Sequence, residues 1–231
     1  MTTYKKDFFT AVIMVKNMAK NGDARAQNNL GIMYETGYGV PQDYTEAVKW
    51  YQTAANKGHA DAQFNLGSMY ARGLGVAQDY TKAIKLYRRA ANKGKGHAHA
   101  QFKLGFMYVQ GLGVPQDHTK AARWYRAAAD QGHAHAQFAL GTMYAEGLGV
   151  PQDYTEAVTL YRAAANQGDA DAQFKLAAMY AEGLGVTQDD TEAVKLYRAA
   201  ADQGDAAAQA NLAEMDALNV SPADVLVQLA S

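Results

Sequence analysis

Apolar residues recur along the chain with the spacing of amphipathic helices, with polar residues between them. In the segment 61–72, Ala62, Leu66 and Tyr70 lie four residues apart and therefore share one helical face. A second segment begins at Asp79 and again has one apolar face, made of Ala83, Leu86, Tyr87, Ala90 and Ala91. The pattern predicts a first helix from 61 to 72 that ends at Gly73, a short loop, and a second helix from Asp79 to Gly94.

This helix pair recurs along the chain. The string Ala-Gln-x-x-Leu starts at Ala26, Ala62, Ala100, Ala136, Ala172 and Ala208, with a spacing of 36 residues except for one of 38. Residues 136–171 and 172–207 are identical at 28 of 36 positions. Because one helix pair cannot bury its own apolar face, neighbouring pairs must stack. We therefore predict an all-α solenoid of 36-residue helix-turn-helix repeats as a single domain, with full repeats at 26–61, 62–99, 100–135, 136–171 and 172–207.

The two ends of the chain fit the same frame. Residues 1–25 align as an N-terminal half-repeat, with a helix from Asp7 to about Ala19; a signal peptide is the alternative for this lysine-flanked apolar stretch. Residues 208–231 form a half-repeat with a helix at 208–218 and a short capping helix that starts at Ser221-Pro222. A docking tail is the alternative for that last segment.

Two features of each repeat have a local physical reason. An aspartate opens the second helix and a glutamate follows three residues later, at Asp43/Glu46, Asp153/Glu156 and Asp189/Glu192, which is a variant of the capping box. Lys82 and Lys120 replace that glutamate in two repeats. Glycine recurs inside the first helix and costs about 1 kcal/mol against alanine there, so we expect close helix packing at Gly31, Gly67, Gly105 and Gly141.

These residues resemble a known family. Leu66-Gly67-x-Met69-Tyr70-x-x-Gly73-x-Gly75-Val76, followed by Asp79-x-x-x-Ala83-x-x-x-Tyr87-x-x-Ala90-Ala91-x-x-Gly94, is similar to the Sel-one-like repeat, a relative of the tetratricopeptide repeat. The resemblance implies a right-handed superhelix that binds proteins or peptides, with the first helix of each repeat lining a concave face. It also implies a bacterial scaffold or adaptor rather than an enzyme.

Composition narrows the possible partners. The 22 basic and 23 acidic residues give a net charge of −1, so the whole-chain charge does not favour nucleic acid or an anionic membrane. The absence of cysteine excludes disulfides and thiolate metal sites. We expect no cofactor, no metal, no nucleic acid and no direct membrane insertion, and we expect a cytoplasmic monomer, with export or a periplasmic location as the alternative.

A helical wheel of the first helix identifies the positions opposite its buried face. These positions predict a groove that binds a protein or peptide, with recognition by the residues that vary between repeats. The predicted groove residues are Asn29, Ile32, Phe64, Asn65, Ser68, Arg72, Phe102, Lys103, Phe106, Gln110, Phe138, Thr142, Glu146, Phe174, Lys175 and Glu182. The alternative for the four phenylalanines, which recur in the same place, is packing between repeats.

Other candidate chemistry is weaker. The loops His97-Ala98-His99 and His133-Ala134-His135 could bind a metal, but aspartates occupy the same positions elsewhere, so helix capping is the preferred interpretation. The Gly-x-Gly loops lack the third glycine and the preceding strand of a dinucleotide site. No nucleophile and base converge, so a cell-wall or β-lactam hydrolase is only an alternative function. A structural or regulatory subunit of a membrane complex is a further alternative.

Overall fold

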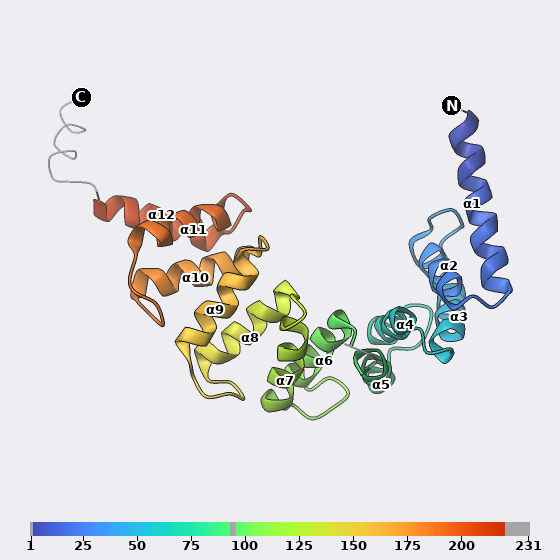
Figure 1. Cartoon of the computed structure of the whole chain (residues 1–231), viewed down its shortest axis with the longest axis horizontal. Coiled ribbons are helices and arrows are strands. Elements are labelled where there is room, and N and C mark those ends of the chain that lie inside the picture. Colours follow the sequence, from blue (N-terminus) through green and yellow to red (C-terminus); the bar gives the residue numbers. More distant parts are fainter. Residues whose placement is uncertain (1, 93–95, 220–231) are drawn as a thin grey trace. The chain divides into compact units, whose positions relative to one another are not determined.

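The computed structural model describes residues 2–92 and 96–219, and this part of the chain is built from helices without any strand (Figure 1). The predicted all-α solenoid class is therefore confirmed. The capping helix predicted from Ser221 lies outside the described residues, as does Gly94. The helices are α1 (Thr2–Lys20), α2 (Ala24–Thr36), α3 (Tyr44–Asn56), α4 (Ala60–Arg72), α5 (Tyr80–Ala91), α6 (Ala98–Gln110), α7 (His118–Ala129), α8 (Ala134–Glu146), α9 (Tyr154–Ala165), α10 (Ala170–Glu182), α11 (Asp190–Ala201) and α12 (Ala206–Asn219).

The chain divides into two compact units, residues 1–124 and 125–231, with the boundary inside α7. In the first unit, α2 packs on α3 and α4 on α5, and the pairs are joined by contacts of α3 with α4 and of α5 with α6. The second unit repeats this order, with α8 on α9, α10 on α11, and α9 against α10. Each repeat thus covers the apolar face of its neighbour, as expected for a solenoid.

The even-numbered helices, called A helices below, begin and end where the sequence predicts. His59 is the N-cap of α4, and its Nδ1 accepts a hydrogen bond from the Ala62 N–H at 3.3 Å. Asp23 and Asp169 cap α2 and α10 in the same way. At the other end, Gly73 takes the left-handed conformation with φ 67° and donates its N–H to the Met69 carbonyl.

The odd-numbered helices, called B helices below, start at the predicted aspartates. The carboxylate of Asp43 accepts a hydrogen bond from the Glu46 N–H at 3.0 Å, and Asp153 and Asp189 do the same. The capping-box glutamates make ion pairs: Glu46 with Lys49 and Glu192 with Lys195. α1 differs, because it begins at Thr2 and passes through Asp7 instead of starting after it.

The glycine inside α2, α4 and α8 marks a close helix contact, as predicted. A Cβ atom at Gly67 would lie 2.8 Å from Cε1 of Tyr87 in α5, and one at Gly141 would lie 2.9 Å from Tyr161 in α9. The tyrosine rings fill the space that the missing side chains leave, and they are almost fully buried.

In α2, α4, α6 and α8, a buried glutamine joins the helix to the B helix before it. This residue is the second of the Ala-Gln string, and its side-chain amide donates to a carbonyl in the last turn of the preceding B helix. Gln63 bonds the Ala55 carbonyl at 3.2 Å, and Gln137 bonds the Ala129 carbonyl at 3.3 Å. Gln101 keeps the bond, to Ala91 at 3.3 Å, although two extra residues precede it. The 38-residue spacing therefore leaves the contact between repeats intact.

Candidate protein-interaction surface

Adjacent A helices of the first unit lie side by side and contact each other through polar side chains. Asn65 of α4 donates Nδ2 to Oδ1 of Asn28 in α2 at 3.0 Å. At the other end of the same two helices, Arg72 lies 3.6 Å from Glu35, whose carboxylate also accepts a hydrogen bond from the Tyr51 hydroxyl at 2.6 Å. Polar contacts therefore join α2 and α4 near both ends, and two grooves open over the A helices of this unit.

The first groove lies over the N-terminal halves of α2, α4 and α6 and has a volume of about 450 Å³. Of the predicted residues it contains Asn29, Ile32, Phe64 and Asn65. Sequence reasoning missed the rest of its lining, which is polar and comes mainly from the helix starts: Arg25, Asn28, His59, Asp61, His97 and His99. The helical wheel could not find the capping histidines, because they precede the helix on which the wheel is drawn.

Histidines at these helix starts act as caps, as the preferred interpretation predicted. His97 accepts a hydrogen bond at Nδ1 from the Ala100 N–H at 3.2 Å, and its Nε2 lies 3.3 Å from Oδ1 of Asp61. Its ring stacks on Phe64 with 4.8 Å between the centroids. Burial lowers the pKa of His97, and the nearby Asp61 carboxylate partly offsets this effect.

A smaller groove of about 230 Å³ lies near the C-terminal halves of α4 and α6. It unites four predicted residues from two repeats, and two of them are cationic. Arg72 and Lys103 supply the charge, Phe106 is 42% exposed, and Ser68 forms a 3.1 Å hydrogen bond with the Tyr87 hydroxyl. Tyr80, Met107 and Leu112 complete an apolar wall. This groove fits an apolar side chain next to a negatively charged group.

All four recurring phenylalanines are half-buried, and three of them contact a tyrosine of the repeat core. Phe64, Phe138 and Phe174 lie 5.6–5.8 Å from the rings of Tyr87, Tyr161 and Tyr197 in the B helix of the same repeat. These contacts favour the packing interpretation over a row of free aromatic anchors. The Lys103 amine lies 5.7 Å from the ring centroid of Phe102.

The remaining predicted residues lie on the same side of their helices but outside the two grooves. Gln110 is exposed at the end of α6, and Thr142 accepts a hydrogen bond from the Tyr161 hydroxyl at 3.1 Å. Three charged residues of the second unit are exposed: Glu146, Lys175 and Glu182. All of the predicted positions are at least partly accessible, which agrees with the wheel. Binding at these positions stays a prediction.

Three further findings concern the described part of the chain. It contains no group of three histidine, cysteine or acidic side chains that could hold a metal ion. His135 instead lies 3.0 Å from the Asp169 carboxylate, across two adjacent helix starts. None of the described helices has the length and apolar character needed to cross a membrane.

The geometry is that of an α-solenoid repeat protein with grooves over its A helices. The chain belongs to the Sel1 repeat family, whose model matches residues 24–59, 60–95, 98–133, 134–169 and 170–205. Repeat proteins of this kind generally mediate protein–protein interactions and are generally non-catalytic. None of the curated proteins compared with the chain matches it.

Solved structures of related proteins show the same fold. The chain is similar to c5321, a protective antigen of uropathogenic Escherichia coli with an SLR fold, at 39% identity and a TM-score of 0.88 over 95% of this chain. It spans about half of that protein, since the match covers 47% of c5321. A Sel1 repeat protein of Oxalobacter formigenes matches at 34% identity and a TM-score of 0.82, covering 94% of this chain and 87% of that one. YrrB, a tetratricopeptide protein with an unusual peptide-binding site, shares the fold at 20% identity and a TM-score of 0.52, covering 89% of this chain and 97% of that one.

Proposed function

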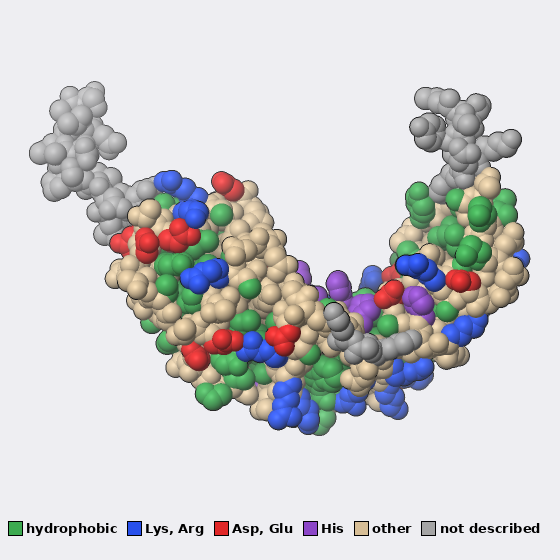
Figure 2. All heavy atoms as spheres, viewed as in Figure 1, with side chains coloured by type: hydrophobic (Ala, Val, Ile, Leu, Met, Phe, Trp, Pro, Cys, Tyr) green, Lys and Arg blue, Asp and Glu red, His purple; other side chains and the backbone are tan. Residues whose placement is uncertain are grey.

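We propose that the chain is a non-catalytic adaptor that binds a protein or peptide along the A helices of its first unit. The two adjoining grooves over α2, α4 and α6 carry this proposal (Figure 2 shows the molecule in the orientation of Figure 1, with histidines in purple). Together they offer exposed apolar groups at Ile32 and Phe106, amide groups at Asn29 and Asn65, and cations at Arg72 and Lys103. Apolar anchors surrounded by hydrogen-bonding groups are typical of protein-binding surfaces.

The grooves suit an extended segment better than a small substrate. Both are open to solvent along the helices, and their lining comes from consecutive repeats. The backbone of an extended peptide needs polar partners at regular spacing, which the asparagines of α2 and α4 provide. The cationic end at Arg72 and Lys103 favours a peptide with a negative charge next to an apolar residue.

Selection from a random peptide library tests this proposal. Peptides selected on the full chain should bind at least about tenfold more weakly to the Lys103→Glu, Phe106→Ala double variant, because it removes both the charge and the apolar anchor. The Lys49→Ala variant is the control, since Lys49 is exposed on α3 and belongs to neither groove nor to the predicted binding positions. Thermal melts establish that the variants fold. Selected peptides that bind all three proteins equally would place the binding surface elsewhere.

A further inference from the structure

The near-zero net charge of the chain is the sum of two units with opposite net charges. Residues 1–124 contain 17 basic and 8 acidic side chains, whereas residues 125–231 contain 5 basic and 15 acidic ones. The first unit therefore has a net charge of about +9 and the second of about −10, at neutral pH. Figure 2 shows lysine and arginine side chains gathered over α5 and α7. The whole-chain sum was therefore the wrong quantity from which to judge electrostatic partners.

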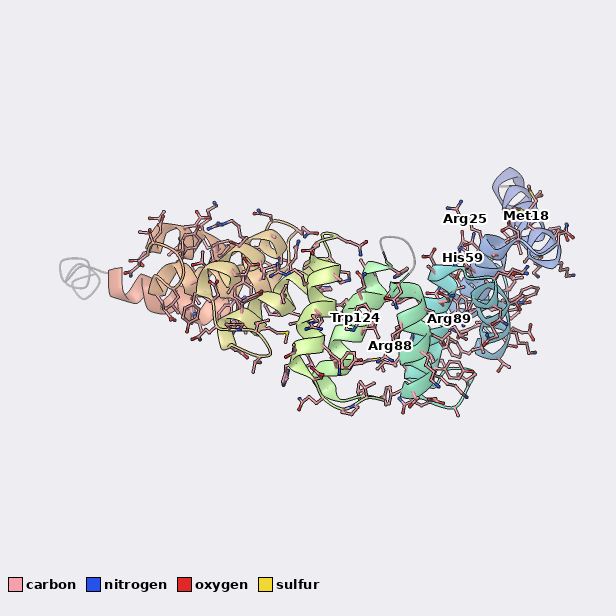
Figure 3. The ribbon with its side chains drawn as sticks, turned by 60° about the horizontal axis from the view of Figure 1, so that its bottom comes forward. Met18, Arg25, His59, Arg88, Arg89 and Trp124 are labelled. Carbon is pink, nitrogen blue, oxygen red and sulfur yellow. The ribbon has the colours of Figure 1, made fainter. Side chains whose placement is uncertain are left out.

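The excess positive charge of the first unit concentrates on two neighbouring B helices. Figure 3 shows Arg88 and Arg89 on α5 and Trp124 on α7, and Trp124 packs against the apolar cluster that α5 helps to form. We call the following residues of these helices the α5–α7 basic face: Lys82, Lys85, Arg88, Arg89, Lys120 and Arg123. All of them are exposed except Arg88, which is half-buried.

One arginine of the second unit, at the same place in its repeat, has a carboxylate beside it. Arg126 of α7 donates Nη2 to the Tyr144 hydroxyl at 3.0 Å and lies 5.4 Å from the centroid of that ring. The same Nη2 donates to Oε1 of Glu156 in α9 at 2.7 Å. One carboxylate from the next B helix thus completes the cluster of arginine, tyrosine and glutamate.

The equivalent cluster in the first unit lacks this carboxylate. Arg88 donates a hydrogen bond to the Tyr108 hydroxyl, and its guanidinium carbon lies 5.9 Å from the ring centroid. Lys120 takes the place of the glutamate, and its amine lies 5.7 Å from the centroid of the same ring. Two cations therefore share one ring, and the Lys120 amine has its ion pair with Asp117 of its own helix cap, at 2.8 Å.

This substitution exchanges an attraction between repeats for a repulsion. The hydrogen bond and ion pair with Asp117 raise the pKa of Lys120, and the positive charge of Arg88 opposes this rise. In the second unit, burial lowers the pKa of Arg126, but the hydrogen bond to Glu156 helps to raise it above its ordinary value. A bound carboxylate from outside the chain would restore the missing interaction in the geometry that Glu156 already shows. Lys85, Arg89 and Arg123 are also exposed on these two helices, and Arg89 donates Nη2 to the Ala55 carbonyl at the end of α3 at 3.1 Å.

We propose that the α5–α7 basic face binds an acidic segment of a partner protein, with one carboxylate held between Arg88 and Lys120. The inference rests on the proposed adaptor function and adds a second surface, on B helices instead of A helices. A carboxylate is favoured over a phosphate because the equivalent cluster of the next repeat binds a carboxylate. A long nucleic acid is disfavoured because the second unit of the same chain is acidic and repels it.

The test uses fluorescence anisotropy of a labelled peptide of alternating glutamate and serine, with the full-length chain at low salt. Lys120→Glu should weaken binding at least about fivefold, because it seats a carboxylate of the chain itself beside Arg88. The same change should leave the melting temperature unchanged or higher, since it rebuilds the ion pair seen at Arg126 and Glu156. A variant that merely damaged the fold would bind the peptide more weakly and would also melt at a lower temperature. The mirror change, Glu156→Lys, should create a second site and strengthen peptide binding at some cost in melting temperature.

The outcomes separate this proposal from its competitors. Equal peptide binding by the wild type and by Lys120→Glu would overturn it. Tighter binding of a single-stranded oligonucleotide than of the peptide would reassign the face to nucleic acid. Self-association at low salt that Lys120→Glu abolishes would reassign it to contacts between copies. The Lys103→Glu, Phe106→Ala groove variant should retain peptide binding, so that failure of the groove and failure of the basic face remain distinguishable.

Discussion

Gly67 of α4 lies directly against the ring of Tyr87 in α5, and the Cβ atom of an alanine at this position would be only 2.8 Å from Cε1 of the ring. Tyr87 is 2% exposed and its hydroxyl is hydrogen-bonded to Ser68, so the ring cannot move aside without loss. We predict that Gly67→Ala lowers the free energy of unfolding by about 1–2 kcal/mol, because overpacking outweighs the better helix propensity of alanine. Urea denaturation measures this difference.

The last repeat supplies the control for this change. Ala177 replaces the glycine there and is fully buried in a cluster with Tyr197. Ala177→Gly should also destabilise the protein, by about 1 kcal/mol, since that repeat is already packed around a methyl group. If Gly67→Ala proved as stable as the wild type, close packing would not explain the recurrent glycine.

Gln137 ties two consecutive repeats together through its side-chain amide. It donates to the Ala129 carbonyl at 3.3 Å and accepts a hydrogen bond from Gln167 at 2.7 Å. We predict that Gln137→Ala lowers the free energy of unfolding by about 1–2 kcal/mol, because a buried carbonyl loses one donor and a small cavity forms. The equivalent Gln209 in α12 is exposed, so Gln209→Ala should change stability by less than about 0.5 kcal/mol. Equal effects would contradict a burial-dependent role.

Local features of the repeat were predictable from sequence, but contacts between repeats were not. The cap at Asp79 and the left-handed Gly73 depend on residues within one turn, and both occur as predicted. The Ala-Gln string was recognised as a repeat, yet the partner of Gln63 is eight residues upstream, across a loop. A pattern of helical faces does not show which carbonyl will lie there.

The candidate surface shows the same division. The wheel of α4 placed Asn65 and Ser68 on the accessible side because that depends only on helical geometry. His59 and Asp61 reach the first groove because α2, α4 and α6 lie side by side, which is a property of the stacking. The basic face was hidden for another reason, since a whole-chain net charge carries no information on where the charges lie.

His97 makes the stability of the first unit depend on pH. Its Nδ1 accepts the N-cap hydrogen bond of α6, so only the imidazole without a proton on Nδ1 can cap the helix. In the folded chain, burial lowers the pKa of His97 below its ordinary value of 6.5, which the unfolded chain retains. The unfolded chain therefore binds the proton more readily. The stabilisation by neutral His97 is complete above that unfolded pKa and is lost as the pH falls through the lower, folded pKa.

An asparagine at this position isolates the effect, because it caps a helix without titrating. Between neutral pH and about pH 5, the wild type should lose more stability than His97→Asn, by up to about the value of one N-cap, 1 kcal/mol. Urea denaturation at both pH values gives the change in the free energy of unfolding for each protein, and the two changes are compared. The contributions of the other titrating groups, including Asp61 and His99, largely cancel in this comparison. The same pH response in both proteins would exclude His97 as its source.

Gly75, the second glycine of the Gly-x-Gly loop, contacts the preceding repeat instead of a phosphate group. A Cβ atom there would lie 2.4 Å from the carbonyl carbon and oxygen of Tyr44, at the start of α3. Its φ of +68° is also left-handed, which disfavours any side chain. Two separate costs therefore oppose a side chain at this position, one from the backbone conformation and one from the contact between repeats.

Gly132 separates these two costs, because it has a similar φ of +82° but no atom within 4 Å of such a Cβ. Gly132→Ala should therefore cost only about 1 kcal/mol, for the backbone conformation alone. Gly75→Ala should cost at least about 3 kcal/mol, because the backbones of two repeats must separate. Chemical denaturation of both variants measures the loss in the free energy of unfolding. Similar losses would show that the contact of Gly75 with Tyr44 does not add to the cost.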